Sequence, residues 1–118
     1  MTTVRVQRVY DPPAGDGFRV LVDRLWPRGV AKEAAAVDLW AKALTPSDEL
    51  RRWYHGHRDG EGEFAARYRT ELDAADTAAV LEQLTAHDEV VLVTAVREPE
   101  HSHVPVLREW LSERGVGA

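Results

Sequence analysis

The chain has 118 residues, with 15 basic and 20 acidic side chains, five histidines and no cysteine. Its length fits one domain over residues 1–118, and its hydrophobic content of 44% is typical of a globular chain. Without cysteine, disulfides, thiol nucleophiles, iron–sulfur clusters and thiolate zinc sites are excluded. The longest apolar run, at 90–96, is far shorter than the ~20 residues of a membrane helix. Residues 1–11 show no apolar signal-peptide stretch, so we expect a cytoplasmic protein with no membrane partner.

The net charge of −5 is distributed unevenly along the chain. Residues 1–58 hold ten Lys or Arg and seven Asp or Glu, a balance of +3, whereas residues 59–118 hold five and thirteen, a balance of −8. Such a split is typical of an anion-binding face in the first half, although small chains also show imbalance by chance. The overall negative charge argues against general attraction to nucleic acid or to anionic membranes.

The first half of the chain predicts strands separated by strong turn signals. Alternating apolar residues predict a strand over Val4–Tyr10, and the Pro- and Gly-rich stretch 11–17 predicts a turn. A second strand is expected over Phe18–Leu25, ended by Pro27 and Gly29. One or two helical turns are expected at 31–36, followed by a short strand around Leu39 and Trp40.

The second half of the chain predicts mainly helices. We expect one helix to begin with Thr45 as the cap and Pro46 at the first helical position, and a second to span 63–73. Asp76 is the expected cap of a third helix, and Ser102 the cap of a last helix that ends near Gly115. Between these two, the nearly continuous apolar run 90–96 predicts a buried strand. The alternation predicts an α/β fold, with a small, largely parallel sheet flanked by helices.

In such sheets, ligands usually bind beyond the carboxyl ends of the strands, and residues 23–29 follow the second expected strand. Here Arg24 and Arg28 are close in the sequence to a carboxylate, Asp23. The paired N–H donors of a guanidinium group match the paired oxygens of a phosphate or a carboxylate. Gly29 allows backbone N–H groups to approach the same anion, and Trp26 is a candidate stacking surface. The alternative is structural, with Asp23 pairing with an arginine to fasten the turn and Trp26 packing in the core.

A second candidate segment, residues 97–103, follows the strand at 90–96. His101 or His103 is a candidate general acid or base, and Ser102 is a candidate nucleophile or anion ligand. The alternative is that Ser102 only caps the helix and that both histidines are exposed. The two His-x-His pairs, at 55–57 and 101–103, are also compatible with zinc or iron, but 101–103 is expected at a helix start, where both rings do not share one face. We therefore expect no metal and no cofactor.

Three blocks of sequence carry a resemblance to a known family. They are DRLWPRG with Lys32 at 23–32, W-x-K at 40–42, and PS-x-x-LR-x-W at 46–53. On these blocks the chain resembles the domain of unknown function 488 family, specifically its short YeaO-like members, over nearly its whole length. The resemblance implies an α/β fold with a small parallel sheet, and no known activity. It marks a largely charged and aromatic set of matching positions: Arg8, Asp23, Arg24, Trp26, Arg28, Gly29, Lys32, Trp40, Lys42, Ser47, Arg51, Trp53 and His101.

The chain also departs from the pattern that this resemblance implies. Close relatives tend to have Asn where this chain has Ser102. More distant, longer members carry cysteine in the last strand and in a Cys-His-Arg turn, where this chain has Thr94 and the residues 102–104. Any thiol chemistry in those relatives is therefore excluded here.

The leading hypothesis is a pocket that binds an anionic ligand such as a phosphorylated metabolite, a nucleotide or a nucleic-acid end. The predicted ligand-binding residues are Arg8, Arg24, Trp26, Arg28, Gly29, Lys32, Lys42, Arg51 and Ser102. If the protein is a hydrolase or transferase, His101 is the expected general acid or base, and Asp23 orients Arg24 or the substrate. Two alternatives stay open: a non-catalytic module that binds nucleic acid or protein, and a charged block with a purely structural role. The sequence decides neither the oligomeric state nor whether the protein is an enzyme.

Overall fold

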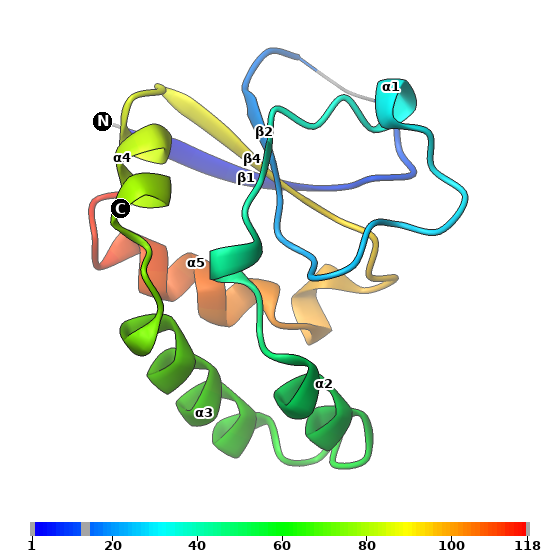
Figure 1. The fold of residues 1–118 in the computed structure, drawn as a ribbon, viewed down its shortest axis with the longest axis vertical. Helices are drawn as coiled ribbons and strands as arrows, with labels where there is room; N and C mark the ends of the chain where they lie inside the picture. The colour runs from blue at the N-terminus through cyan, green and yellow to red at the C-terminus, as the bar shows by residue number, and fades with distance from the viewer. Residues whose placement is uncertain (1, 13–14, 118) are drawn as a thin grey trace.

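The computed structural model describes residues 2–12 and 15–117 as a small sheet with helices packed around it (Figure 1). The elements in chain order are β1 (Thr3–Arg8), β2 (Phe18–Leu21), α1 (Lys32–Ala35), β3 (Leu39–Trp40), the 3₁₀ turn η1 (Lys42–Leu44), α2 (Asp48–His55), α3 (Glu61–Ala74), α4 (Ala78–Thr85), β4 (Glu89–Thr94), the 3₁₀ turn η2 (Pro99–His101) and α5 (Val104–Ser112). The predicted α/β class is confirmed. Part of the turn predicted at 11–17, residues 13–14, lies outside the described residues.

The four strands form one parallel sheet in the order β1-β4-β2-β3. The two central strands, β4 and β2, are buried on both faces, which explains their nearly continuous apolar sequences. Val20 and Leu92 face a core built from α2 to α5, whereas Leu21 and Val93 face a smaller core with Ala35 of α1. Most of the helical mass therefore covers one face of the sheet.

Several predicted boundaries differ from the structure. The strands predicted at 4–10 and 90–96 are β1 and β4, which end two residues earlier, at Arg8 and Thr94. The second strand was predicted to run to residue 25, but β2 ends at Leu21. Val22 still donates a backbone hydrogen bond to Val93, and the chain then leaves the sheet at Asp23. The predicted cap Thr45 is also wrong, because Ser47 is the cap of α2 and its Oγ accepts from the Leu50 N–H at 3.1 Å. Both residue types are good caps, and the sequence pattern alone did not distinguish them.

The last two helices also begin differently from the prediction. α4 follows Thr77 rather than Asp76, and α5 follows His103 rather than Ser102. Ser102 still accepts a hydrogen bond from the Val104 N–H at 3.2 Å, so it contributes to the start of α5 from one residue earlier. As a result His103 lies at the junction between the loop and the helix.

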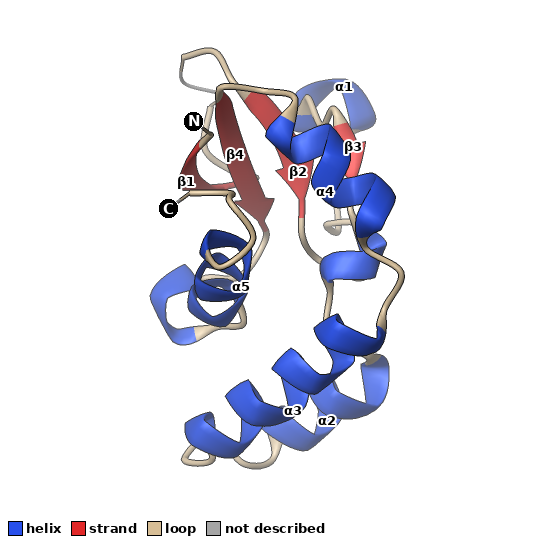
Figure 2. Cartoon of the chain, turned by 90° about the vertical axis from the view of Figure 1, so that its left-hand side faces the viewer, coloured by secondary structure: helices blue, strands red, loops and turns tan. Residues whose placement is uncertain are grey.

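The helices α2 and α3 pack side by side beyond one end of the sheet (Figures 1 and 2). In Figure 2 the arrowheads of β2 and β4 point toward the end of the molecule where these two helices lie. Glu71 of α3 joins the pair, since its carboxylate accepts from the backbone N–H of Ser47 at 2.8 Å and from its hydroxyl at 2.6 Å. The carboxyl ends of the strands therefore face α2, which closes one side of the space described next.

Candidate functional site

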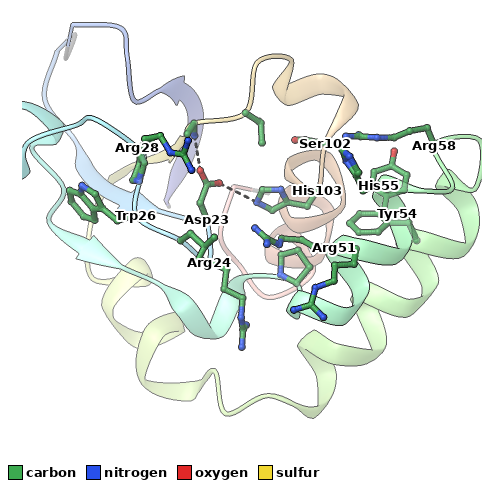
Figure 3. A pocket seen from close by; sticks show the side chains of 17 residues that line it. Asp23, Arg24, Trp26, Arg28, Arg51, Tyr54, His55, Arg58, Ser102 and His103 are labelled. Carbon is green, nitrogen blue, oxygen red and sulfur yellow. Dashed lines mark hydrogen bonds and ion pairs between the residues drawn. The ribbon is translucent and has the colours of Figure 1, made fainter.

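A cavity of about 610 Å³ lies where the loops after β2 and β4 approach α2 (Figure 3). Its wall is built from five segments: the loop 23–28, the loop after β4, the turn before α5, α2 with the residues that flank it, and Phe64 of α3. The position agrees with the rule that ligand sites of parallel sheets lie beyond the carboxyl ends of the strands. The lining residues are Asp23, Arg24, Leu25, Trp26, Pro27, Arg28, Pro46, Arg51, Arg52, Tyr54, His55, Arg58, Phe64, Ala95, Val96, Ser102 and His103.

Asp23 joins the ends of the two central strands at the base of this cavity. Its Oδ1 accepts from the Thr94 hydroxyl and its Oδ2 accepts from the Ala95 N–H, both at 2.7 Å. Its backbone carbonyl accepts from the Trp40 indole, also at 2.7 Å. In the described residues no ion pair joins Asp23 to Arg24 or Arg28, so the Asp–Arg pair of the structural alternative is not formed. Asp23 fastens the strand ends to each other rather than an arginine to the turn.

His103 is buried beside Asp23. Its Nε2 donates to the Val22 carbonyl at 2.8 Å and lies 3.7 Å from Asp23 Oδ1. Burial lowers the pKa of His103 below its ordinary value of 6.5, and Arg51 acts in the same direction, while Asp23 and the Val22 hydrogen bond oppose the shift. The imidazole is therefore neutral at pH 7. Because Nε2 carries the proton that it donates to Val22, Nδ1 has a free lone pair.

Five arginines line the cavity, against the single carboxylate of Asp23. Two of them converge on Asp48 at the start of α2, whose Oδ1 lies 3.8 Å from Arg24 Nε and 3.5 Å from Arg51 Nη2. Arg24 also donates to the Thr45 hydroxyl at 3.3 Å. Arg28 is exposed and makes no hydrogen bond or ion pair with any residue that the structure describes. The cavity thus holds several guanidinium groups whose donors are available to a ligand.

The aromatic side chains of the cavity are packed mainly against the protein itself. Tyr54 stacks on Phe64 with a centroid distance of 4.2 Å, and the guanidinium of Arg58 lies 5.1 Å from the centroid of the Tyr54 ring. The Trp26 indole donates to the Val30 carbonyl at 2.8 Å and meets Trp40 edge to face. These contacts hold the walls in place, and Trp26 lies at the far side of the cavity from Tyr54 (Figure 3).

Of the residues predicted from the sequence, six line the cavity: Asp23, Arg24, Trp26, Arg28, Arg51 and Ser102. The Ser102 hydroxyl is engaged, since it donates to the Pro99 carbonyl at 2.7 Å and accepts from the N–H of Val104. The predicted residues therefore converge from two loops and one helix that are distant in the sequence.

The other five predicted residues lie outside the lining of this cavity. Arg8 donates through Nε to the Val96 carbonyl at 3.0 Å, and the Lys42 ammonium lies 4.1 Å from the centroid of the Trp40 ring. Lys32 and His101 are exposed, in α1 and η2. Gly29 is exposed too, with φ +77°, a backbone conformation that the turn after Arg28 requires.

Four residues around α2 were not selected from the sequence but line the cavity: Arg52, Tyr54, His55 and Arg58. A helical period was an available signal for His55 alone, because it is spaced i+4 from Arg51 on α2, whereas Arg58 lies in the turn beyond the end of that helix. His103 was considered together with His101 as a candidate base, and the structure buries His103 while it exposes His101.

One histidine of each His-x-His pair, His55 and His103, lines the cavity, and the other two, His57 and His101, lie outside its lining. His57 stacks on Trp53 and its Nδ1 lies 2.7 Å from the Trp53 carbonyl, and His103 is held by Val22. Over residues 2–12 and 15–117, no three His, Cys, Asp or Glu side chains are grouped so that they could hold a metal ion. In the same residues no helix is long and apolar enough to cross a membrane.

Comparison with known proteins places the chain in a family. The model of a family described as the inactive DUF488-N3 subclade matches residues 3–115. The chain belongs to this subclade. The DUF488-N3 match agrees with the resemblance seen in the sequence blocks, and it covers every residue of the cavity lining.

Relatives of this subclade member occur in bacteria. An uncharacterised protein of Mycobacterium tuberculosis, Rv3073c, is 46% identical over 114 residues, which cover 96% of this chain and 97% of the relative. An uncharacterised protein of Mycobacterium bovis shows the same identity and coverage. The uncharacterised protein YeaO of Escherichia coli is 37% identical over 110 residues, covering 92% of this chain and 96% of YeaO. No solved structure matches the chain significantly.

Proposed function

We propose that the protein binds an anionic, phosphate-bearing ligand in the cavity at the strand ends, without catalysing a reaction on it. The observation that carries this proposal is the charge of the cavity wall. Five guanidinium groups line it, and the one carboxylate in the lining, Asp23, already accepts hydrogen bonds from the ends of β4. Guanidinium forks bind phosphate oxygens through paired donors, and a concave wall strengthens their combined field.

The arginines are arranged so that binding needs little reorganisation. Arg24 and Arg51 are drawn toward each other by Asp48, at 3.8 and 3.5 Å. Both stay partly exposed, and Arg28, in the same loop as Arg24, has no hydrogen-bond or ion-pair partner among the described residues. A ligand that takes up the donors of Arg28 replaces water rather than an internal hydrogen bond. Preorganised charges of this kind bind with a small entropic cost.

Binding without catalysis is supported by two observations. In the described residues no hydroxyl group is hydrogen-bonded to His103, and the hydroxyl of Ser102 is committed to the turn before α5. A nucleophile paired with a base is therefore not formed in this geometry. The family to which the chain belongs is itself described as inactive. A small ligand is favoured over a nucleic-acid strand, because the charge is concentrated in a cavity of a protein with net charge −5.

The proposal is tested by calorimetric titration of inorganic phosphate and of phenyl phosphate into the wild-type protein and into Arg28→Ala and Arg51→Ala. Hydrogen bonds to charged groups contribute about 1.5–3 kcal/mol, so each substitution should weaken binding by about tenfold or more. Arg28 is the sharper choice, since no contact with the described residues is lost when it is removed.

The matched control is Arg97→Ala, because Arg97 is an exposed arginine outside the cavity lining. This variant should bind both probes as the wild type does. The proposal is contradicted if neither probe binds the wild-type protein, or if Arg97→Ala weakens binding as much as Arg28→Ala. A steep loss of affinity for single-stranded DNA with salt, together with no binding of small phosphates, would instead favour the nucleic-acid alternative.

A further inference from the structure

The base of the cavity carries a hydrogen-bond acceptor that the arginines do not explain. His103 is about nine-tenths buried, with 9% of its surface exposed, and it belongs to the cavity lining. Its Nε2 is committed to the Val22 carbonyl at 2.8 Å. In Figure 3 its ring lies between Asp23 and the side chain of Arg51. The remaining ring nitrogen, Nδ1, has no hydrogen-bond partner among the described residues.

This Nδ1 atom is open to the cavity rather than sealed in the core. Among the described residues, the only enclosed side-chain nitrogen or oxygen without a partner is Nη1 of Arg69 in α3. The lone pair of His103 therefore has contact with the space that a ligand would fill. The tautomer is fixed by geometry, because the Val22 carbonyl can only accept, so Nε2 must carry the proton.

Because His103 Nδ1 accepts a hydrogen bond while the arginines around it donate, the cavity favours some anions over others. An oxyanion without a proton, such as sulfate at neutral pH, places lone pairs opposite the lone pair of Nδ1, which is unfavourable. An oxyanion with a P–OH group donates a hydrogen bond there while its other oxygens accept from the guanidinium groups. Inorganic phosphate at pH 7 always carries at least one hydroxyl, and a phosphomonoester carries one below its second pKa of about 6.

We propose that the cavity selects phosphate groups that carry a hydroxyl over sulfate and over phosphodiesters, with Nδ1 of His103 accepting the hydrogen bond from that hydroxyl. This inference rests on the proposed anion-binding function and names its ligand class: free hydrogen phosphate or the terminal phosphate of a monoester. Asp23 positions the acceptor, because its Oδ1 at 3.7 Å favours the Nε2–H form of the ring that leaves Nδ1 unprotonated.

The decisive test compares inorganic phosphate with sulfate at pH 7.0 and constant ionic strength, by calorimetry on the wild-type protein. Simple electrostatics predicts that sulfate, which is fully dianionic, binds at least as tightly as phosphate. The proposal predicts the opposite order, with phosphate bound about tenfold more tightly, as expected for one good hydrogen bond to a charged group. Dimethyl phosphate should bind as weakly as sulfate or more weakly.

The same titrations distinguish the two sources of phosphate. Between pH 6 and 8, binding of phenyl phosphate should weaken as its hydroxyl ionises, whereas inorganic phosphate keeps a hydroxyl throughout and should keep its advantage over sulfate. The other titratable or charged groups that face His103 are Asp23, Arg51 and, through its ring at 6.1 Å, Tyr68. Burial raises the pKa of Tyr68 well above its usual value, so Tyr68 does not titrate in this range.

His103→Gln removes the Nδ1 lone pair while the glutamine Nε2 can still donate to Val22. We expect this variant to bind phosphate and sulfate with similar affinity, whereas His101→Gln, which alters an exposed histidine outside the cavity lining, should keep the tenfold preference. If His103→Gln does not fold, the imidazole ¹⁵N NMR signals of the wild-type protein show whether Nδ1 of His103 contacts the bound anion. The Nδ1 signal of His103 should move with phosphate and stay unchanged with sulfate.

Equal binding of phosphate and sulfate by the wild type, or an unmoved Nδ1 signal at saturating phosphate, overturns this inference and leaves the anion-binding function standing. If neither ion binds, both the inference and the proposed function fail.

Discussion

Two regions of this molecule use arginine in opposite ways. Arg19, in β2, is buried and its donors are occupied: Nε by the Ala36 carbonyl, Nη1 by Gln7 Oε1 at 2.6 Å and Nη2 by the Ala35 carbonyl. Arg28, in the loop after the same strand, is exposed and lacks a partner among the described residues. The first arginine is part of the structure and the second is available to a ligand. The difference shows that an arginine count says little until the partners of each side chain are known.

The largest effect expected from this comparison is the loss of unfolding free energy when Arg19 is replaced. Arg19→Ala leaves Gln7 Oε1 and two carbonyls without their donor, and it should lower the free energy of unfolding by about 3 kcal/mol. Arg28→Ala should change it by no more than about 0.5 kcal/mol, as for an exposed residue without contacts. Urea denaturation of the two variants checks the contrast. Similar losses in both would contradict the division between structural and available arginines.

A smaller loss is expected for the carboxylate that joins the strand ends. Asp23→Ala leaves the Ala95 N–H and the Thr94 hydroxyl without their acceptor, which should cost about 2 kcal/mol of unfolding free energy. The comparison variant is Asp48→Ala, because Asp48 is exposed and only approaches Arg24 and Arg51. It should cost less than about 1 kcal/mol. If Asp48→Ala proves the more harmful of the two, Asp23 is not the fastening group.

The smallest effect is a pH dependence that comes from His103. Burial lowers the pKa of His103 in the folded protein, so the unfolded chain binds a proton more readily as the pH falls through 6.5. The contribution of neutral His103 to the free energy of unfolding is therefore fully present above the pKa of this histidine in the unfolded chain. It decreases from about pH 7 downward, until His103 is also protonated in the folded protein. Urea denaturation at pH 7.5 and 5.5 should show this decrease in the wild type and in His101→Gln, and a smaller one in His103→Gln. Equal decreases in all three proteins would contradict the assignment to His103.

The sequence predicted the elements of the fold better than their ends. The apolar pattern of β4 and the four-residue spacing of Phe64, Tyr68 and Leu72 in α3 were sufficient, because burial imposes those periods directly. The end of β2 was not predictable, because Val22 is as apolar as the strand before it. β2 ends where the Asp23 carboxylate accepts a hydrogen bond from the Thr94 hydroxyl at the end of β4, 71 residues away in the sequence.

The candidate site was predictable only in part, for a similar reason. The rule on strand ends identified Asp23, Arg24 and Arg28, since these residues follow directly after β2. The rule did not distinguish His101 from His103; His101 was preferred because the family resemblance marks that position, whereas the structure buries His103 in the cavity lining. The contribution of α2 depends on how α2 and α3 fold back beyond the sheet, which no local pattern encodes.

The central claim, that the available guanidinium groups form a phosphate site, is tested most directly by following backbone amide signals while inorganic phosphate is added to ¹⁵N-labelled protein. We expect saturable shifts at the lining residues of three segments: 23–28, 51–58, and the pairs 95–96 and 102–103 that flank the loop after β4. The first two segments include each arginine of the cavity lining. The amides around Arg19 should stay unchanged. Shifts that do not saturate, or that gather around residues 5–8 and 19 instead, would contradict it.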